Sequence, residues 1–448
     1  IHISSFLYFR TYHRFVQYLF FKQALNQRIE AVTFRTLVVG VDIAKAKQWA
    51  RFVDCRGIEY GKAMPFHNDR DGFERILAKI REICKENCFE DVIVGMEPTG
   101  HYWKALANFF TKQENIRVVL VNPYHTKKAK ELDDNSQTKS DRKDALTIAR
   151  LVRDGRYSEA YLPHDIYADL RVLATSRNSV NRQKNALENT ILAVLDEYFP
   201  EFTKVFKYPY KGKAAMQILK ACPFPKYILA LGTEGVVAEM KKAAKRAVGQ
   251  KRARLLVDTA QVSVGVDYGV DAAKYKLQLL LEELELVNRQ LVQIEERMAE
   301  TLQKTGIAEY LLSIKGVGVV SLAVCLGELG DPMRFDDPRQ MCRLAGYNLI
   351  EDSSGKNQSG TCISKRGRKG LRRVLYQMAL TSVAVNPEMK ELYRYLKSRP
   401  VNPLKKMQAL VVISKKLLVL IHTLAKKRQF YDSDKVFGMV RKSQLAAA

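Results

Sequence analysis

The segment T-L-V-V-G-V-D at residues 36–42 determines the fold, because it is a run of apolar, largely β-branched residues that ends on an acid. A run of this kind is typical of a strand buried on both faces. The segment D-V-I-V-G-M-E at residues 91–97 repeats the pattern and also ends on an acid. We therefore expect two central strands whose carboxyl ends carry Asp42 and Glu97.

The residues around these two strands predict a mixed sheet covered by helices. Alternating apolar residues predict a second strand over 48–54 and a third over 58–64, joined by a hairpin corner. The apolar spacing over 71–85 predicts an amphipathic helix, and a helix over 101–112 and a strand over 117–121 follow. A three-strand meander followed by alternating helices and strands is the order of a ribonuclease-H-like α/β fold.

Two more acids lie in the segment S-Q-T-K-S-D-R-K-D-A at residues 136–145. If a helix begins near Ser140, Asp141 and Asp144 share one face of its first turn, where the helix dipole keeps carboxylates ionised. A lone D-x-x-D pair is more often a helix cap with surface charge, and a lone strand-end acid is more often a surface residue. Together the four acids predict a metal site, because divalent cations relieve repulsion among carboxylates. Two Mg²⁺ ions held in this way can clamp the attacking and leaving oxygens of a phosphodiester.

The chain of 448 residues is strongly basic, with a net charge of +26. This surplus points to a polyanionic partner, nucleic acid before membrane. The seven cysteines are scattered without zinc-ligand spacing, and we interpret them as reduced thiols of a cytoplasmic protein. Charged and polar residues interrupt the aromatic segment 6–21, which argues against a membrane span. Because the sequence begins at Ile1, we expect residues 1–34 to be a leader outside the fold.

Residues 161–305 are expected to form long helices that support oligomerisation. Apolar residues recur every seven positions over 165–199 and again, more regularly, over 270–303. Two arrangements remain open, an antiparallel hairpin within one chain and a coiled coil between chains, and we expect dimerisation. Residues 200–270 are mixed and basic, and no specific role follows from their sequence.

The C-terminal part begins with I-K-G-V-G at residues 314–318, between two apolar helical segments. This is a helix-hairpin-helix pattern, whose glycines let backbone N–H groups approach a phosphate. The alternative is an ordinary glycine-bearing turn. A basic run follows at 363–373, which we interpret as a phosphate cradle rather than a solvated face. The candidate nucleic-acid-binding residues are Lys315, Gly316, Gly318, Lys365, Arg366, Arg368, Lys369, Arg372 and Arg373.

Between these two features lies a polar segment, residues 346–360, that reads as an unstructured loop. It contains Ser353, Ser354 and Ser359, and two of these serines precede a glycine. A serine hydroxyl placed between cations and a metal centre could attack phosphorus as a nucleophile. Spacing alone supports this hypothesis weakly, because Ser-Gly loops are common.

As a set, these motifs resemble the DEDD transposases of bacterial insertion sequences, the IS110 family. The resemblance covers roughly residues 35–430 in the family's order. One departure is the segment 347–350, Y-N-L-I, where many relatives carry a proline. The matching stretches are G-V-D-I-A-K at Asp42, M-E-P-T-G-H-Y at Glu97, V-N-P at 121–123, K-S-D-R-K-D-A at Asp141 and Asp144, and then I-K-G-V-G, R-L-A-G, S-S-G and I-S-K-R-G.

The resemblance implies a Holliday-junction-resolvase-like domain over residues 35–160 and a transposase domain over 306–430, followed by a tail at 431–448. It implies that the four acids bind Mg²⁺ and that the serine before glycine, Ser354, is the nucleophile. Ser359 offers a second Ser-Gly pair, and the distance to I-S-K-R-G favours Ser354.

The resemblance also implies a recombinase that excises and inserts its own element through a covalent phosphoserine. Its partners would be target and donor DNA, a structured non-coding guide RNA, and further copies of itself in a dimer or tetramer, in the bacterial cytoplasm with no membrane contact. Two alternatives stay open: a metal-dependent junction nuclease that uses only the acids, and a silent nucleic-acid-binding remnant of a transposon.

Overall fold

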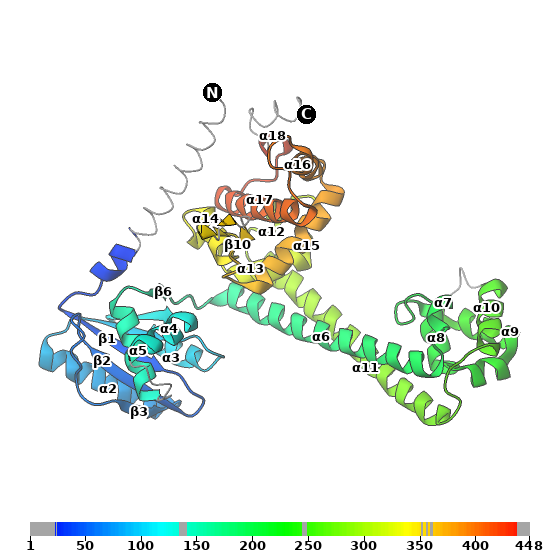
Figure 1. Ribbon diagram of the computed structural model, residues 1–448, viewed down its shortest axis with the longest axis horizontal. Coiled ribbons are helices and arrows are strands. Elements are labelled where there is room, and N and C mark those ends of the chain that lie inside the picture. Colours follow the sequence, from blue (N-terminus) through cyan, green and yellow to red (C-terminus); the bar gives the residue numbers. More distant parts are fainter. Residues whose placement is uncertain are drawn as a thin grey trace. The chain divides into compact units, whose positions relative to one another are not determined.

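The computed structural model describes residues 23, 25–133, 141–243, 249–350, 353–354, 357–358 and 362–436. The chain divides into two compact units, Ile1–Leu162 and Pro163–Ala448. The first unit is an α/β sheet domain, and the second is almost entirely helical (Figure 1). The predicted fold class is therefore confirmed.

The first unit is built on a six-stranded mixed sheet with the order β3-β2-β1-β4-β5-β6. The first three strands form the predicted antiparallel meander, β4 and β5 continue the sheet in parallel with β1, and β6 closes the edge antiparallel to β5. The strands are β1 (Thr36–Asp42), β2 (Lys47–Val53), β3 (Met64–His67), β4 (Asp91–Met96), β5 (Ile116–Val121) and β6 (Tyr157–Glu159).

Helices cover both faces of this sheet, and the alternation along β1 explains how. Leu37, Val39 and Val41 pack in one core with α2 (Arg70–Asn87) and α3 (Trp103–Phe110). Val38 faces the other way and packs with α5 (Asp141–Arg153). A further helix, α4 (Pro123–Asp133), contacts α5. The strand that opens the sequence pattern is thus buried on both faces.

Three local features of this unit differ from the sequence expectations. The third strand begins at Met64 rather than at residue 58, and only an isolated bridge joins Glu59 to Val53. Neither β6 nor α4 is predicted. Part of the expected leader also belongs to the unit, because the Arg28 guanidinium donates to the backbone oxygen of Tyr157. The boundary placed at residue 34 is therefore corrected toward the N-terminus.

Two long helices form the axis of the second unit, α6 (Asp165–Tyr198) and α11 (Val270–Gln303). The start of α6 shares a core with the end of α11, through Leu170 and Met298. The end of α6 shares another core with the start of α11, through Leu195 and Leu277. The helices are therefore antiparallel, and an ion pair of 2.6 Å between Arg177 and Glu295 joins the first half of α6 to the second half of α11. Of the two arrangements left open, the chain forms the hairpin.

Residues 199–269, which we call the helical cap, connect these two helices. Its core combines four buried aromatic side chains with aliphatic ones and packs against the tips of α6 and α11; the aromatic residues are Phe199, Phe202, Phe206 and Phe224. Its helices are α7 (Phe202–Val205), α8 (Lys213–Ala221), α9 (Pro225–Ala243) and α10 (Gln250–Gln261).

The rest of the second unit is a helical body around α17 (Lys406–Lys427). By length and composition this helix could cross a membrane. Half of its apolar stretch is buried, however, and its residues belong to the core of the helical body. Its neighbours are α12 (Ala308–Leu312), α13 (Val319–Leu329), η1 (Pro332–Arg334), α14 (Pro338–Leu344), α15 (Lys369–Val385), α16 (Pro387–Ser398) and α18 (Ser433–Val436), with the short strands β7 (Leu349–Ile350), β8 (Ser353–Ser354), β9 (Asn357–Gln358) and β10 (Cys362–Ile363).

Candidate active site

The acids Asp42 and Glu97 lie at the carboxyl ends of two neighbouring parallel strands. In the register of β1 and β4, Val41 is paired with Met96, so the two acids occupy the next positions on adjacent strands. Adjacent strands are about 4.8 Å apart, which brings the two carboxylates within reach of one ligand. Both residues are half-buried. The Glu97 carboxylate accepts a hydrogen bond of 2.6 Å from the Thr99 hydroxyl.

Helix α5 lies directly against β1 at Gly40. A Cβ atom at Gly40 would lie 2.1 Å from the Ala145 carbonyl oxygen and 2.4 Å from the Ala149 nitrogen, so only glycine allows the helix this close. Asp144 precedes Ala145, and Asp141 begins the helix one turn earlier. The contact therefore positions the backbone of the first turn of α5 over the end of β1.

A stacked pair that the sequence analysis missed strengthens this contact. Trp49 is paired with Asp42 across β2 and β1. The Arg142 guanidinium, from the first turn of α5, lies 4.6 Å from the Trp49 ring centroid. A cation held over an indole ring is attracted by the negative face of the ring. This pair joins the helix that carries Asp141 and Asp144 to the strand end that carries Asp42, and Trp49 gave no signal beyond its place in an alternating strand.

The four acid positions fit a divalent cation through their donor chemistry. Carboxylate oxygens are the hard ligands that Mg²⁺, Mn²⁺ and Ca²⁺ prefer. The β1–β4 register and the approach of α5 at Gly40 bring the four backbone positions to one end of the sheet. Within the described ranges, no three acidic, histidine or cysteine side chains are grouped closely enough to hold a metal. The backbone positions of the four acids therefore suit a metal ion, whereas the described side chains do not converge on a single metal position.

Residues 346–360, which we call the Ser354 segment, contain short strands among their described residues where the sequence predicts an unstructured loop. Ser353 and Ser354 form β8, in which Ser354 is paired with Asn357 of β9. Outside this pair, Ile350 of β7 is paired with Cys362 of β10. Ser359 lies outside the described residues.

The glycine turn at residues 313–318 joins α12 to α13, as the helix-hairpin-helix pattern predicts. Gly316 has a φ of +95°, and a Cβ there would lie 2.5 Å from the Ser382 Cα atom, so packing alone accounts for this glycine. Gly318 differs, because nothing lies within 4 Å of its Cβ position and it caps the N-terminus of α13 without a side-chain hydrogen bond. Lys315 is exposed beside it. Gly318 and Lys315 are thus the accessible members of this turn.

The six cations of the basic run fall into two groups. Arg368 lies 3.7 Å from the Glu328 carboxylate, and Arg372 donates a hydrogen bond of 3.0 Å to the Ala345 carbonyl oxygen, so both hold the start of α15 against the helical body. The exposed members, which can reach a phosphate, are Lys365, Arg366, Lys369 and Arg373. Arg373 also donates to the Asn178 side chain of α6.

Glu328 is a further residue that the sequence analysis missed. It lies at the end of α13, with 23% of its side chain exposed, next to Arg368. Burial raises the pKa of its carboxyl, while the guanidinium groups of Arg171 and Arg373 lower it. A half-buried acid among three arginines acts as an internal counterion for the basic run. A single Glu near the end of an apolar helix carries no sequence signal for this role.

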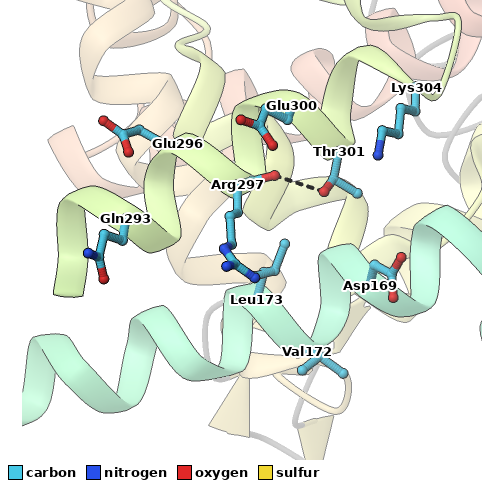
Figure 2. Close-up of a pocket in the computed structure, with 9 residues that line it drawn as sticks. All are labelled: Asp169, Val172, Leu173, Gln293, Glu296, Arg297, Glu300, Thr301 and Lys304. Atoms are coloured by element: carbon cyan, nitrogen blue, oxygen red, sulfur yellow. Dashed lines mark hydrogen bonds between the residues drawn. The ribbon is translucent and has the colours of Figure 1, made fainter.

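A groove of about 800 Å³ lies between α6 and α11 (Figure 2), and none of the predicted site residues is among those that line it. Figure 2 draws one hydrogen bond between the residues that line this groove. The Thr301 hydroxyl donates it to the Arg297 carbonyl oxygen, at 2.8 Å. Three carboxylates and two cations share it, so it presents no strong charge of either sign. The lining residues are Asp169, Val172, Leu173, Gln293, Glu296, Arg297, Glu300, Thr301 and Lys304.

Comparisons with known proteins match both halves of the chain. The DEDD transposase model of the IS110 family matches residues 39–200, and a model described as the transposase IS116/IS110/IS902 family matches residues 308–394. The first match ends where α6 ends, and the second begins with α12. The matched residues include all four acids, the Ser354 segment and the basic run, and they leave out the helical cap beyond residue 200.

Individual relatives agree with these models. The mini-circle putative transposase for IS117 of Streptomyces coelicolor is 24% identical, over 80% of this chain and 87% of the relative. An uncharacterized 43.6 kDa protein of insertion element IS110, from the same organism, is 22% identical, over 66% of this chain and 73% of the relative. The transposase for insertion sequence element IS1328 of Yersinia enterocolitica is 32% identical over 90 residues, 20% of this chain and 27% of the relative.

Proposed function

This chain belongs to the IS110 family of transposases, and we propose that it excises and inserts an insertion sequence with a serine nucleophile and a carboxylate-held metal. As a transposase it is an enzyme that acts on DNA. One observation supports the proposed metal chemistry. The β1–β4 register and the approach of α5 at Gly40 bring the backbones of the four acids toward one end of the sheet.

Asp42, Glu97, Asp141 and Asp144 are the residues that would hold the divalent cation, with Mg²⁺ as the proposed metal. When bound, the metal supplies positive charge to the oxygens of the scissile phosphodiester. The acids orient that charge, and the β1, β4 and α5 backbones hold the acids. Half-burial of Asp42, Glu97 and Asp144 limits competing water at the site.

Ser354 is the proposed nucleophile. Its Oγ attacks phosphorus, so an Oγ–P bond forms while one bond between phosphorus and a sugar oxygen breaks, and the departing sugar oxygen takes up a proton. Attack on the phosphoserine by the hydroxyl of another strand releases Ser354 and rejoins the DNA. The exposed cations Lys365, Arg366, Lys369 and Arg373 are suited to neutralise the phosphates on either side.

We further propose that a structured RNA made by the element selects the target and donor DNA by base pairing. The net charge of +26 supports two polyanionic partners rather than one. When base pairing selects the sequence, few side chains need to read base edges. This arrangement is consistent with a basic run that contacts backbone rather than bases.

The proposed assembly is a homodimer or homotetramer. The heptad residues of α11 are used within the chain, yet Tyr275, Leu279 and Leu286 lie on its outer side with 64%, 44% and 47% of their surface exposed. These three share one face because they are four and seven residues apart. A second copy of the chain can bury this stripe.

The decisive experiment incubates the protein and its element's RNA with end-labelled target DNA in Mg²⁺, then denatures the mixture and looks for DNA attached to protein. A serine recombinase gives an adduct that is lost in both Ser354→Ala and Asp144→Ala. Ser353→Ala is the matched control, since it removes a hydroxyl from the same strand β8 and should keep the adduct.

Two results would contradict the proposal. Free cleaved ends that persist in Ser354→Ala without any adduct would indicate a nuclease that uses the acids alone. Tight binding without strand breakage in Mg²⁺ would indicate a nucleic-acid-binding remnant.

A further inference from the structure

The helical cap is strongly basic, and neither family model matches it beyond residue 200. Residues 199–269 contain 13 Lys and Arg against five Asp and Glu. Its charge is therefore not accounted for by the acid site, the Ser354 segment or the basic run. A basic surface on a protein that acts on nucleic acid is a candidate contact for a further strand.

One turn of the cap presents lysines and a tyrosine together. The Lys211 amide donates a hydrogen bond of 3.0 Å to the Tyr208 carbonyl oxygen, which closes the turn. Phe206 and Pro209 are buried and anchor it. Tyr208 has 52% of its surface exposed, and the ammonium groups of Lys207 and Lys211 lie 5.6 and 5.0 Å from its ring centroid. A hydrogen-bonded turn thus presents an exposed ring beside two cations.

The N-terminal turn of α10 extends this surface. The Arg252 guanidinium lies 5.8 Å from the ring centroid of Phe206, the residue that anchors the tyrosine turn. Lys251 and Arg252 are both exposed. Arg252 therefore brings a further cation to the residue that anchors the tyrosine turn, in addition to the two lysines beside Tyr208.

A second cluster of lysines around a tyrosine, at Tyr227, provides a comparison, because an acid of the same chain lies within it. Lys226 and Lys274 lie 5.7 and 4.1 Å from the Tyr227 ring centroid. Asp271 neutralises one of the two charges of this cluster, because it lies 3.2 Å from the Lys226 ammonium, and it also accepts a hydrogen bond from the Tyr227 hydroxyl. The Tyr208 cluster has no such acid among the contacts of the described residues.

We propose that the helical cap binds single-stranded nucleic acid, with one base stacked on Tyr208 and the adjacent phosphates held by Lys207, Lys211 and the start of α10. An exposed aromatic ring flanked by cations suits a single strand, because an unpaired base offers a face for stacking and its phosphates lie on either side. A duplex keeps its bases stacked on one another. The binding does not depend on the serine chemistry, so it can succeed or fail separately.

The test measures binding of the full chain to labelled oligothymidylate, oligouridylate and a DNA duplex over a range of salt concentrations. We expect Tyr208→Ala to weaken single-strand binding about tenfold. We expect Lys207→Gln with Lys211→Gln to lower the slope of log affinity against log salt by about 1.4, the value for two phosphates on a single strand. Lys226→Gln with Lys274→Gln is the control, since it removes the same charge from the cluster that holds Asp271 and should lower the slope less.

Comparing oligothymidylate with oligouridylate distinguishes DNA from RNA as the ligand. The strand whose affinity falls more in Tyr208→Ala is the one that this surface binds. The proposal is overturned if the control pair lowers the slope as much as Lys207→Gln with Lys211→Gln. It is also overturned if Tyr208→Ala weakens the duplex alone or leaves all three ligands unaffected. Thermal unfolding of each variant separates a binding effect from loss of the fold.

Discussion

The acid end of the sheet and the Ser354 segment are built in opposite ways. Asp42 and Glu97 extend strands that are buried along almost their whole length, and α5 packs on them through a backbone contact at Gly40. Ser354 lies in a strand of two residues, next to a second pair in which Leu349 has 70% of its surface exposed. A core of this kind positions the acids before any ligand arrives, whereas a two-residue strand pair contributes little binding surface of its own.

The largest effect should come from disturbing the rigid side at Gly40. A methyl group in Gly40→Ala meets the backbone of α5, so we expect a loss of about 1–3 kcal/mol of unfolding free energy and a displaced Asp141–Asp144 turn. Gly95→Ala is the matched control, because Gly95 is paired with Gly40 and its new methyl meets the end of the Val152 side chain. In each variant, chemical denaturation measures the unfolding free energy and the DNA adduct assay reports the displacement of the turn. Equal effects in the two variants would show that the backbone contact has no special role.

Metal binding should stabilise the same region. At ten times its dissociation constant, Mg²⁺ should stabilise the folded protein by about 1.4 kcal/mol, and a chelator should reverse the change. Asp42→Asn should remove this response, because the site loses a hard anionic ligand at the strand end. Thermal unfolding with and without Mg²⁺ measures it, with Asp71→Asn on α2 as a control of equal charge. A response that persists in Asp42→Asn would place the metal elsewhere.

A smaller, pH-dependent effect should come from Glu328, the counterion of the basic run. Burial raises the pKa of its carboxyl in the folded protein, so folding takes up a proton between the unfolded pKa of about 4.3 and the raised value. The stability that this group contributes is complete below the unfolded pKa and is lost as the pH rises through the folded pKa. Glu328→Gln removes the dependence.

The stability of Glu328→Gln relative to the unsubstituted protein should therefore improve as the pH rises from about 4 to about 7. Denaturant midpoints at several pH values measure the difference. A difference that stays constant with pH would mean that the arginines offset the effect of burial on the pKa, and a difference that changes in the opposite direction would mean that they outweigh it.

The smallest effect should come from the exposed strand pair beside Ser354. Leu349→Ser removes an apolar side chain that is mostly in solvent, so the unfolding free energy should change by less than about 0.5 kcal/mol. Calorimetry of the protein alone checks this. A loss several times larger would mean that the segment is packed as firmly as the acid end, and the contrast between the two regions would disappear.

The sequence predicted the parts whose signal is local and repeated. The β-branched runs ending at Asp42 and Glu97 became β1 and β4, and the helix from Asp141 followed from its apolar spacing. The heptads predicted α6 and α11, but Leu281 rather than Leu280 is fully buried, since a straight helix drifts from an exact seven-residue period.

The remaining features depend on contacts between distant residues. The strand β6 has three residues, which is too few for a periodic pattern. The stacking of Arg142 on Trp49 and the burial of Glu328 beside Arg368 join residues far apart in the chain. The helical cap combines short helices with a helix interrupted at Gly232, so its aromatic core shows no single period.

The antiparallel course of α6 and α11 has a consequence for how the cap can be gained or lost in evolution. The chain leaves α6 and re-enters α11 at neighbouring points, where the Val266 amide donates a hydrogen bond of 2.9 Å to the Glu197 carbonyl oxygen. A short turn could replace the whole insertion without changing the register of the two helices. The helix tips would then expose Leu195 and Leu277, which are buried against the cap. A chain without the cap should therefore carry polar residues at these two positions.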